Sequence, residues 1–108
     1  MKVKKYHQAY YEICLEGAEH VHWEHKTLRG MILSEVVKLM FKKKREITSL
    51  VADSKQVKVY FGELLELKIS TSLCLGLFVH VSSTNKELLA EVVRAIDGVL
   101  NRISQKTK

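Results

Sequence analysis

The pattern of apolar residues between positions 25 and 104 limits this chain to a layered fold of helices and strands. Residues 84–104 and 25–45 each carry apolar side chains at helical spacing, which predicts two amphipathic helices. Residues 47–81, between them, favour strands because they alternate apolar and polar side chains or are continuously apolar. We therefore expect an α+β domain in the order β-α-β-β-β-α, with two helices on one face of a two-layer, three- to four-stranded, mostly antiparallel sheet.

Local signals place the ends of these elements. Thr84 and Glu87 match a capping box, which predicts that the last helix begins at Thr84. Residues 57–69 are apolar at odd positions except Glu63, which predicts one strand with a bulge at Gly62. Gly98, inside the last helix, indicates either a close contact with another backbone or ordinary packing. Residues 3–16 fit a strand or a helix, and their tyrosine and isoleucine content favours the strand.

The length of 108 residues fits a single domain, residues 1–108, with a short basic tail at 104–108 that we expect to be disordered. No stretch approaches the ~20 apolar residues of a membrane-spanning helix. No apolar region follows the basic N-terminus, which argues against a secretory signal. Cys14 and Cys74 form no C-x-x-C pattern, which argues against a disulfide scaffold or a zinc ribbon and favours a cytoplasmic protein.

A cluster of three histidines, His20, His22 and His25, is the most unusual local feature. Imidazole nitrogens are good ligands for zinc, copper or nickel, so the cluster is a candidate metal site. Its spacing matches no specific zinc motif. The other interpretation is a polar loop or first helical turn with solvated histidines, and we expect no cofactor beyond this candidate metal ion.

Asp53, Glu66 and Lys68 follow the order of an acid and a later E-x-K on strand-like sequence. This order resembles the PD-(D/E)xK core of metal-dependent nucleases, which implies carboxylates that hold Mg²⁺ and a lysine that polarises water. The sequence departs from the family because no proline precedes Asp53 and because a strand-like segment, 73–81, replaces the helix that follows E-x-K. The alternative is a solvent-facing alternation of Glu66 and Lys68 on an antiparallel strand.

Basic residues exceed acidic ones, 18 to 12, for a net charge of +6. They fall into three groups: the block Lys42, Lys43, Lys44 and Arg45; Lys2, Lys4 and Lys5; and Arg102, Lys106 and Lys108. If the groups converge, they form the footprint of a protein that binds a phosphate backbone, with Tyr6, Tyr10, Tyr11 and Trp23 available to stack on bases. A helix that ends in four cations is also typical of a solvated terminus that complements the helix dipole.

Both helices and segment 73–81 carry more apolar surface than a single two-layer fold is expected to bury. The sequence contains no recognisable set of catalytic residues. We therefore expect a non-enzymatic binding or regulatory module that forms a homodimer through the sheet face or the helix 28–41. The alternatives are a nucleic-acid-binding protein that uses residues 42–45 and a nuclease-like magnesium site. The element order of residues 25–104 is similar to that of small sheet-and-helix modules in RNA-binding proteins and dimeric adaptors.

Overall fold

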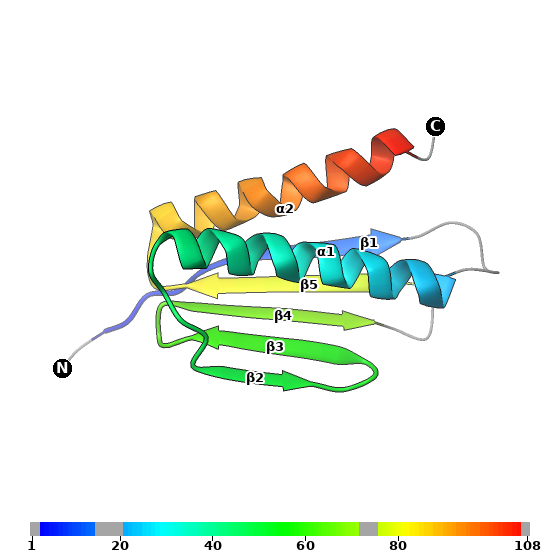
Figure 1. The fold of residues 1–108 in the computed structure, drawn as a ribbon. Helices are drawn as coiled ribbons and strands as arrows, with labels where there is room; N and C mark the ends of the chain where they lie inside the picture. The colour runs from blue at the N-terminus through cyan, green and yellow to red at the C-terminus, as the bar shows by residue number, and fades with distance from the viewer. Residues whose placement is uncertain (1–2, 15–20, 72–75, 107–108) are drawn as a thin grey trace.

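The structure, a computed structural model, describes residues 3–14, 21–71 and 76–106, with side chains for 3–13, 27–71 and 76–103. The elements are β1 (His7–Cys14), α1 (Val21–Lys42), β2 (Ser49–Ala52), β3 (Gln56–Phe61), β4 (Leu65–Thr71), β5 (Gly76–Ser83) and α2 (Lys86–Lys106). The strands form one antiparallel sheet in the spatial order β1-β5-β4-β3-β2, and both helices pack on it (Figure 1). The α+β class is confirmed, and the sheet has one strand more than the largest number expected.

The additional strand arises in residues 57–69, which form two strands where one was expected. Residues 62–64 make a turn in which the Leu64 N–H donates to the Phe61 carbonyl oxygen (3.2 Å). Gly62 has a φ of +61°, a left-handed conformation that glycine adopts without a Cβ penalty. A turn of three residues keeps odd-numbered side chains on the same face of both strands. The apolar alternation therefore continues through the reversal, and the bulge predicted at Gly62 is a hairpin turn.

The N-terminal segment is a strand, as its tyrosine and isoleucine content indicated. β1 pairs with β5 along its whole length, from His7 opposite Ser83 to Cys14 opposite Gly76. The helical interpretation of this segment is wrong. Its alternating side chains point to the two faces of the sheet, in which the segment lies next to β5.

Helix α1 ends three residues before the predicted boundary. The Lys44 N–H donates to the Phe41 carbonyl oxygen and the Arg45 N–H to that of Met40, both at 3.0 Å. Lys44 has a φ of +58°, so the chain leaves the helix through a left-handed residue. Only Lys42 of the basic block lies in the helix, and residues 43–45 follow it.

The cap of helix α2 lies one residue after the predicted site, and the helix itself begins at Lys86. Asn85 caps the helix, because its Oδ1 accepts a hydrogen bond from the Leu88 N–H (3.1 Å). The capping box predicted from Thr84 and Glu87 is therefore wrong. The helix continues to Lys106, into the tail expected to be disordered. Within the described part of the chain, a Cβ added at Gly98 meets nothing within 4 Å, so no close contact with another described backbone segment requires this glycine.

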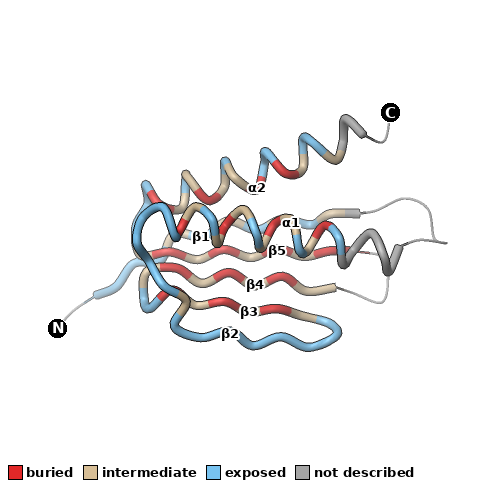
Figure 2. Tube along the Cα trace, viewed as in Figure 1, coloured by how far each residue is buried: buried red, intermediate tan, exposed pale blue. Residues whose placement is uncertain are grey.

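The core lies between the helix layer and one face of the sheet (Figure 2). Both helices bury an apolar stripe in it, and strands β3, β4 and β5 contribute alternate residues. Four further apolar residues of α1 are half-buried against the same core: Met31, Leu33, Val37 and Leu39. The wide apolar stripe of α1 is thus largely used inside the chain, and only Phe41 of this stripe is strongly exposed (59%).

In the described part of the chain, no helix is both long and apolar enough to span a bilayer.

Candidate functional site

Both described helices lie on the same face of the sheet, and no other described element covers the opposite face. The Tyr11 hydroxyl donates a hydrogen bond to Asp97 of α2 (3.1 Å), so odd-numbered residues of β1 face the helices and even-numbered ones face away. The strand register extends this assignment to β5, β4 and β3, and it reverses the numbering in β2, where Val51 lies opposite Lys58 and faces away from the helices. We call the helix-free surface the open face; its residues, all half-buried or exposed, include Gln8, Tyr10, Glu12, Val51, Gln56, Lys58, Tyr60, Glu66, Lys68, Ser70, Phe78, His80 and Ser82.

A row of basic side chains crosses the middle of the open face. Lys58 lies directly opposite Lys68, and Lys68 lies opposite His80, which in turn pairs with Tyr10. Like charges directly opposite each other on a sheet are destabilising. Among the described residues, neither lysine forms an ion pair. The two amines therefore lie on neighbouring strands without an ion-pair partner within 4 Å in the described structure, and a bound anion would stabilise them.

An aromatic pair lies at the end of this row. The rings of Tyr10 and Phe78 are stacked, with centroids 6.2 Å apart and planes inclined by 29°. The His80 ring lies 6.5 Å from that of Tyr10, and its Nε2 is 2.8 Å from Gln8 Oε1, which orients the imidazole. Tyr10 is 63% exposed, so its ring is available to a planar ligand.

The aromatic and basic groups line one hollow of about 280 Å³, formed by Tyr10, Lys68, Ser70, Phe78 and His80. Pockets that enclose a whole drug-sized ligand have volumes of about 300–1,000 Å³. The hollow is therefore suited to one part of a larger ligand, such as a single ring or a phosphate. A ligand that extends along the basic row would also contact Lys58.

The basic block lies at one end of the molecule, where α1 ends, and not on the open face (Figure 1). Lys43 forms an ion pair with Glu91 of α2 at 2.5 Å, and Lys42 lines a hollow between the helices. Lys44 and Arg45 are exposed. All four side chains of the block are thus exposed, and Lys43 is held in an ion pair with the helix layer.

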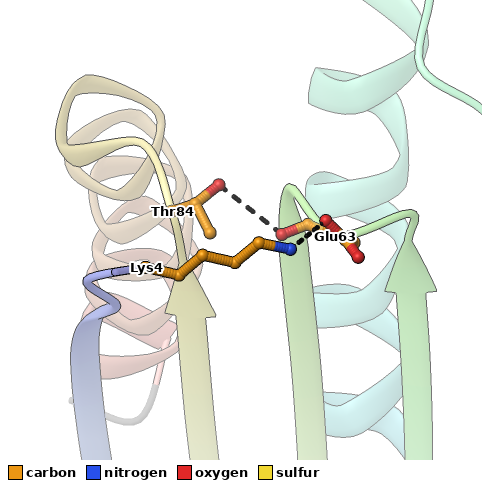
Figure 3. A network of polar contacts seen from close by, with 3 residues as sticks. All are labelled: Lys4, Glu63 and Thr84. Atoms are coloured by element: carbon orange, nitrogen blue, oxygen red, sulfur yellow. Dashed lines mark hydrogen bonds and ion pairs between the residues drawn. The ribbon is translucent and has the colours of Figure 1, made fainter. Parts of the chain in front are cut away.

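The N-terminal basic group reaches the same end. Lys4 forms an ion pair and hydrogen bond with Glu63 in the β3–β4 turn, and the Thr84 hydroxyl lies 3.5 Å from the Glu63 carbonyl oxygen (Figure 3). The hydrogen bond from Lys4 lowers the pKa of the Glu63 carboxyl and raises that of the Lys4 amine. Arg102 of the third group pairs with Glu35 in the helix layer (3.5 Å). Lys4, Lys43 and Arg102 are thus held in three separate ion pairs; Lys2, Lys106 and Lys108 lie outside the described side chains.

The structure does not bring Asp53 together with Glu66 and Lys68. Asp53 Oδ1 accepts hydrogen bonds from the Lys55 and Gln56 N–H groups (2.7 and 2.9 Å) in the β2–β3 turn, and these bonds lower the pKa of its carboxyl. This turn lies beside Thr71, because the Thr71 N–H donates to the Lys55 carbonyl oxygen. Glu66 is five residues from Thr71 along β4, about 16 Å. Glu66 and Lys68 share the open face, as the alternative interpretation expected.

The histidine cluster lies outside the described side chains: His20 is not described, and His22 and His25 are described only as backbone of α1. Among the described residues, no group of three or more His, Cys, Asp or Glu side chains is placed to hold a metal ion.

Of the predicted stacking residues, Tyr10 lies on the open face. Tyr11 faces the helices, Tyr6 precedes β1 and Trp23 lies outside the described side chains. Lys58, Phe78 and His80 were not identified as site residues from the sequence. All three have even residue numbers, which places them on the same face of the sheet. This shared face can be recognised only when the pairing register of the strands is known. No protein-family model and no curated protein matches this sequence.

Proposed function

We propose that the protein binds single-stranded nucleic acid, without catalysing a reaction, through the open face. The observation that carries this proposal is the position of Lys58 and Lys68, directly opposite each other and unpaired, beside the stacked rings of Tyr10 and Phe78. Lysine amines contact phosphates, and aromatic rings stack on bases. The open face supplies both kinds of contact within one continuous row.

A single strand is favoured over a duplex because the exposed aromatic ring needs an unstacked base. Sheets that recognise single strands use aromatic side chains on neighbouring strands to stack two or three bases. Tyr10 on β1 and Phe78 on β5 are such a pair, since these strands are neighbours. A base that stacks on Tyr10 has the Lys68 amine and the His80 ring beside it, in the same hollow.

The hydrogen-bonding groups of the open face suit contacts to base edges and sugar hydroxyls. Ser70 lines the hollow, and Gln8 and Ser82 lie on the same face. Glu12 and Glu66 lie at the borders of the basic row and leave its centre positive. We also propose that the protein is cytoplasmic, as its cysteine pattern led us to expect.

The proposal is tested by fluorescence anisotropy with a labelled single-stranded RNA, over a range of salt concentrations. Each phosphate contact contributes about 0.7 to the slope of log K against log salt for single strands. We expect K58A and K68A each to reduce the slope by about this amount. Y10A is expected to weaken binding by about 1 kcal/mol or more, roughly fivefold, through loss of stacking.

K43A and K44A are the matched controls, because they remove the same charge from the basic block outside the open face. They are expected to change the affinity less than K58A and K68A do. If K43A and K44A abolish binding while the open-face variants bind normally, the contact surface is the basic block and the proposal is wrong. Absence of any salt-dependent binding to the wild-type protein would also overturn it.

A further inference from the structure

Strand β2 forms one edge of the described sheet, and its outer side has no neighbouring strand there. Ser49–Ala52 pairs with β3 on one side only, because β2 is the last strand in the sheet order. All four residues are exposed, and Leu50 and Val51 expose 51% and 53% of their surface (Figure 2). Edge strands are usually protected by charges, prolines, bulges or a very short length, and β2 is short, with four residues. The segment Ser49–Ala52 contains no charge and no proline, whereas the other edge strand, β1, carries Glu12.

The hydrogen-bond pattern identifies the backbone groups that β2 directs outward. The Asp53 N–H donates to the Gln56 carbonyl oxygen (2.9 Å), which makes these two residues a hydrogen-bonded pair. Bonded and non-bonded pairs alternate along an antiparallel ladder, so Val51 and Lys58 form the next bonded pair. Leu50 and Ala52, which lie between bonded positions, therefore direct their N–H and carbonyl groups away from the sheet.

We infer that β2 pairs with β2 of a second copy of this chain, antiparallel and with Val51 opposite Val51 on the two-fold axis. In this register Leu50 of each copy lies opposite Ala52 of the other. All the outward backbone groups of these two residues then find partners in the second copy. A register with Leu50 opposite Leu50 places Ala52 opposite Thr48, whose N–H already donates to the Tyr60 carbonyl oxygen.

The surroundings of the strand favour a second copy as the occupant. The two Val51 side chains, more than half exposed in the single chain, cover each other on the axis. Four residues on each side bury less than the ~1,200 Å² of a typical stable interface, so the dimer is weak and reversible.

The dimer joins two open faces into one surface, a consequence that rests on the proposed function. The basic row of each copy ends at Val51, so the rows of the two copies continue into one another across the axis. A nucleic acid strand long enough to contact Lys58 of both copies would link them and raise the apparent affinity.

Disulfide trapping in the absence of nucleic acid tests the dimer independently of its ligand. Opposed residues of a non-hydrogen-bonded pair have Cα atoms about 4.5 Å apart, within the range that a disulfide spans. Oxidised V51C is therefore expected to form a covalent dimer. L50C is the matched control, because the two Leu50 positions are two residues out of register and too far apart to be bridged. Peptide mapping separates this crosslink from any through Cys14 or Cys74.

Sedimentation equilibrium supplies the second measurement, on the wild-type chain and on V51K, with circular dichroism to confirm that the variant is folded. The wild-type average mass is expected to rise above the monomer value of 12.4 kDa with concentration, while V51K remains at that value. A wild-type mass of 12.4 kDa at submillimolar concentration, or equal crosslinking of L50C and V51C, would overturn the inference. Either result leaves nucleic-acid binding by the single chain untouched.

Discussion

The Tyr11 hydroxyl donates a hydrogen bond to Asp97 Oδ1 at 3.1 Å and so joins β1, at one edge of the sheet, to helix α2. The hydroxyl also lies 3.5 Å from the Val93 carbonyl oxygen. Burial of the phenol, together with this hydrogen bond, raises the pKa of Tyr11 from 10 to about 12. The contact depends on a protonated phenol, because a phenolate would face the Asp97 carboxylate.

A pH dependence of stability follows from this shift. The folded-state pKa is above the unfolded one, so the contribution of Tyr11 is complete below pH 10 and is lost as the pH rises toward 12. We expect the wild-type stability to fall more steeply over this interval than that of Y11F. Urea unfolding at a series of pH values measures the difference, and Y6F, at an exposed tyrosine, is the control. Equal pH profiles for Y11F and the wild type would contradict the assignment.

The glycines of α2 and of the β3–β4 turn are expected to respond oppositely to the same substitution. G98A places a methyl group in open space on a helix, and we expect about 1 kcal/mol of added stability. G62A forces alanine into a left-handed conformation, and we expect a loss of about 1–2 kcal/mol. Thermal or urea unfolding of both variants provides the measurement. A destabilised G98A would mean that the glycine contacts another element after all.

The cap of α2 is tested by two neighbouring substitutions. N85A removes the side-chain oxygen that accepts the Leu88 N–H, and we expect a loss of about 1 kcal/mol. T84A removes only a 3.5 Å contact to the Glu63 carbonyl oxygen, so its cost is expected to be smaller. Chemical unfolding ranks the two variants. The reverse order would restore the capping box that begins at Thr84.

The β2–β3 turn is expected to weaken in acid. Hydrogen bonds from the Lys55 and Gln56 N–H groups lower the pKa of Asp53 below 3.8, its ordinary value. Its contribution is therefore complete above the unfolded pKa and is lost as the pH falls through the folded one. D53A is expected to be less stable than the wild type at neutral pH, and the difference should shrink in strong acid. A constant difference would show that the carboxylate charge is not involved.

The elements of this fold are largely predictable from its sequence, whereas their boundaries and register are not. Residues 25–45 and 84–104 indicated helices because their apolar periodicity extends over many turns. The turn at Gly62 was not predicted because apolar residues keep odd numbers on both sides of it, so the sequence pattern does not change at the turn. The cap at Asn85 was missed because Thr84, one residue earlier, offers an equally good sequence signal.

The candidate site was predictable only in part, for a related reason. Tyr10 was identified by its residue type. Lys58 and Phe78 could not be identified as site residues from the sequence, because their role depends on which residues lie beside them on other strands. The basic block drew attention because its four cations are consecutive. One of these cations is compensated, since Lys43 pairs with Glu91 of α2, which the sequence alone does not reveal.

The pairing of β1 with β5 also sets the order in which the chain can fold during its synthesis. The hairpins β2–β3, β3–β4 and β4–β5 join segments that are close in sequence and leave the ribosome together. β1 emerges first but must wait until β5 has been translated, an interval of roughly 3 to 14 seconds at ordinary elongation rates. Among the five described strands, the first in the chain is therefore the last that can join the sheet.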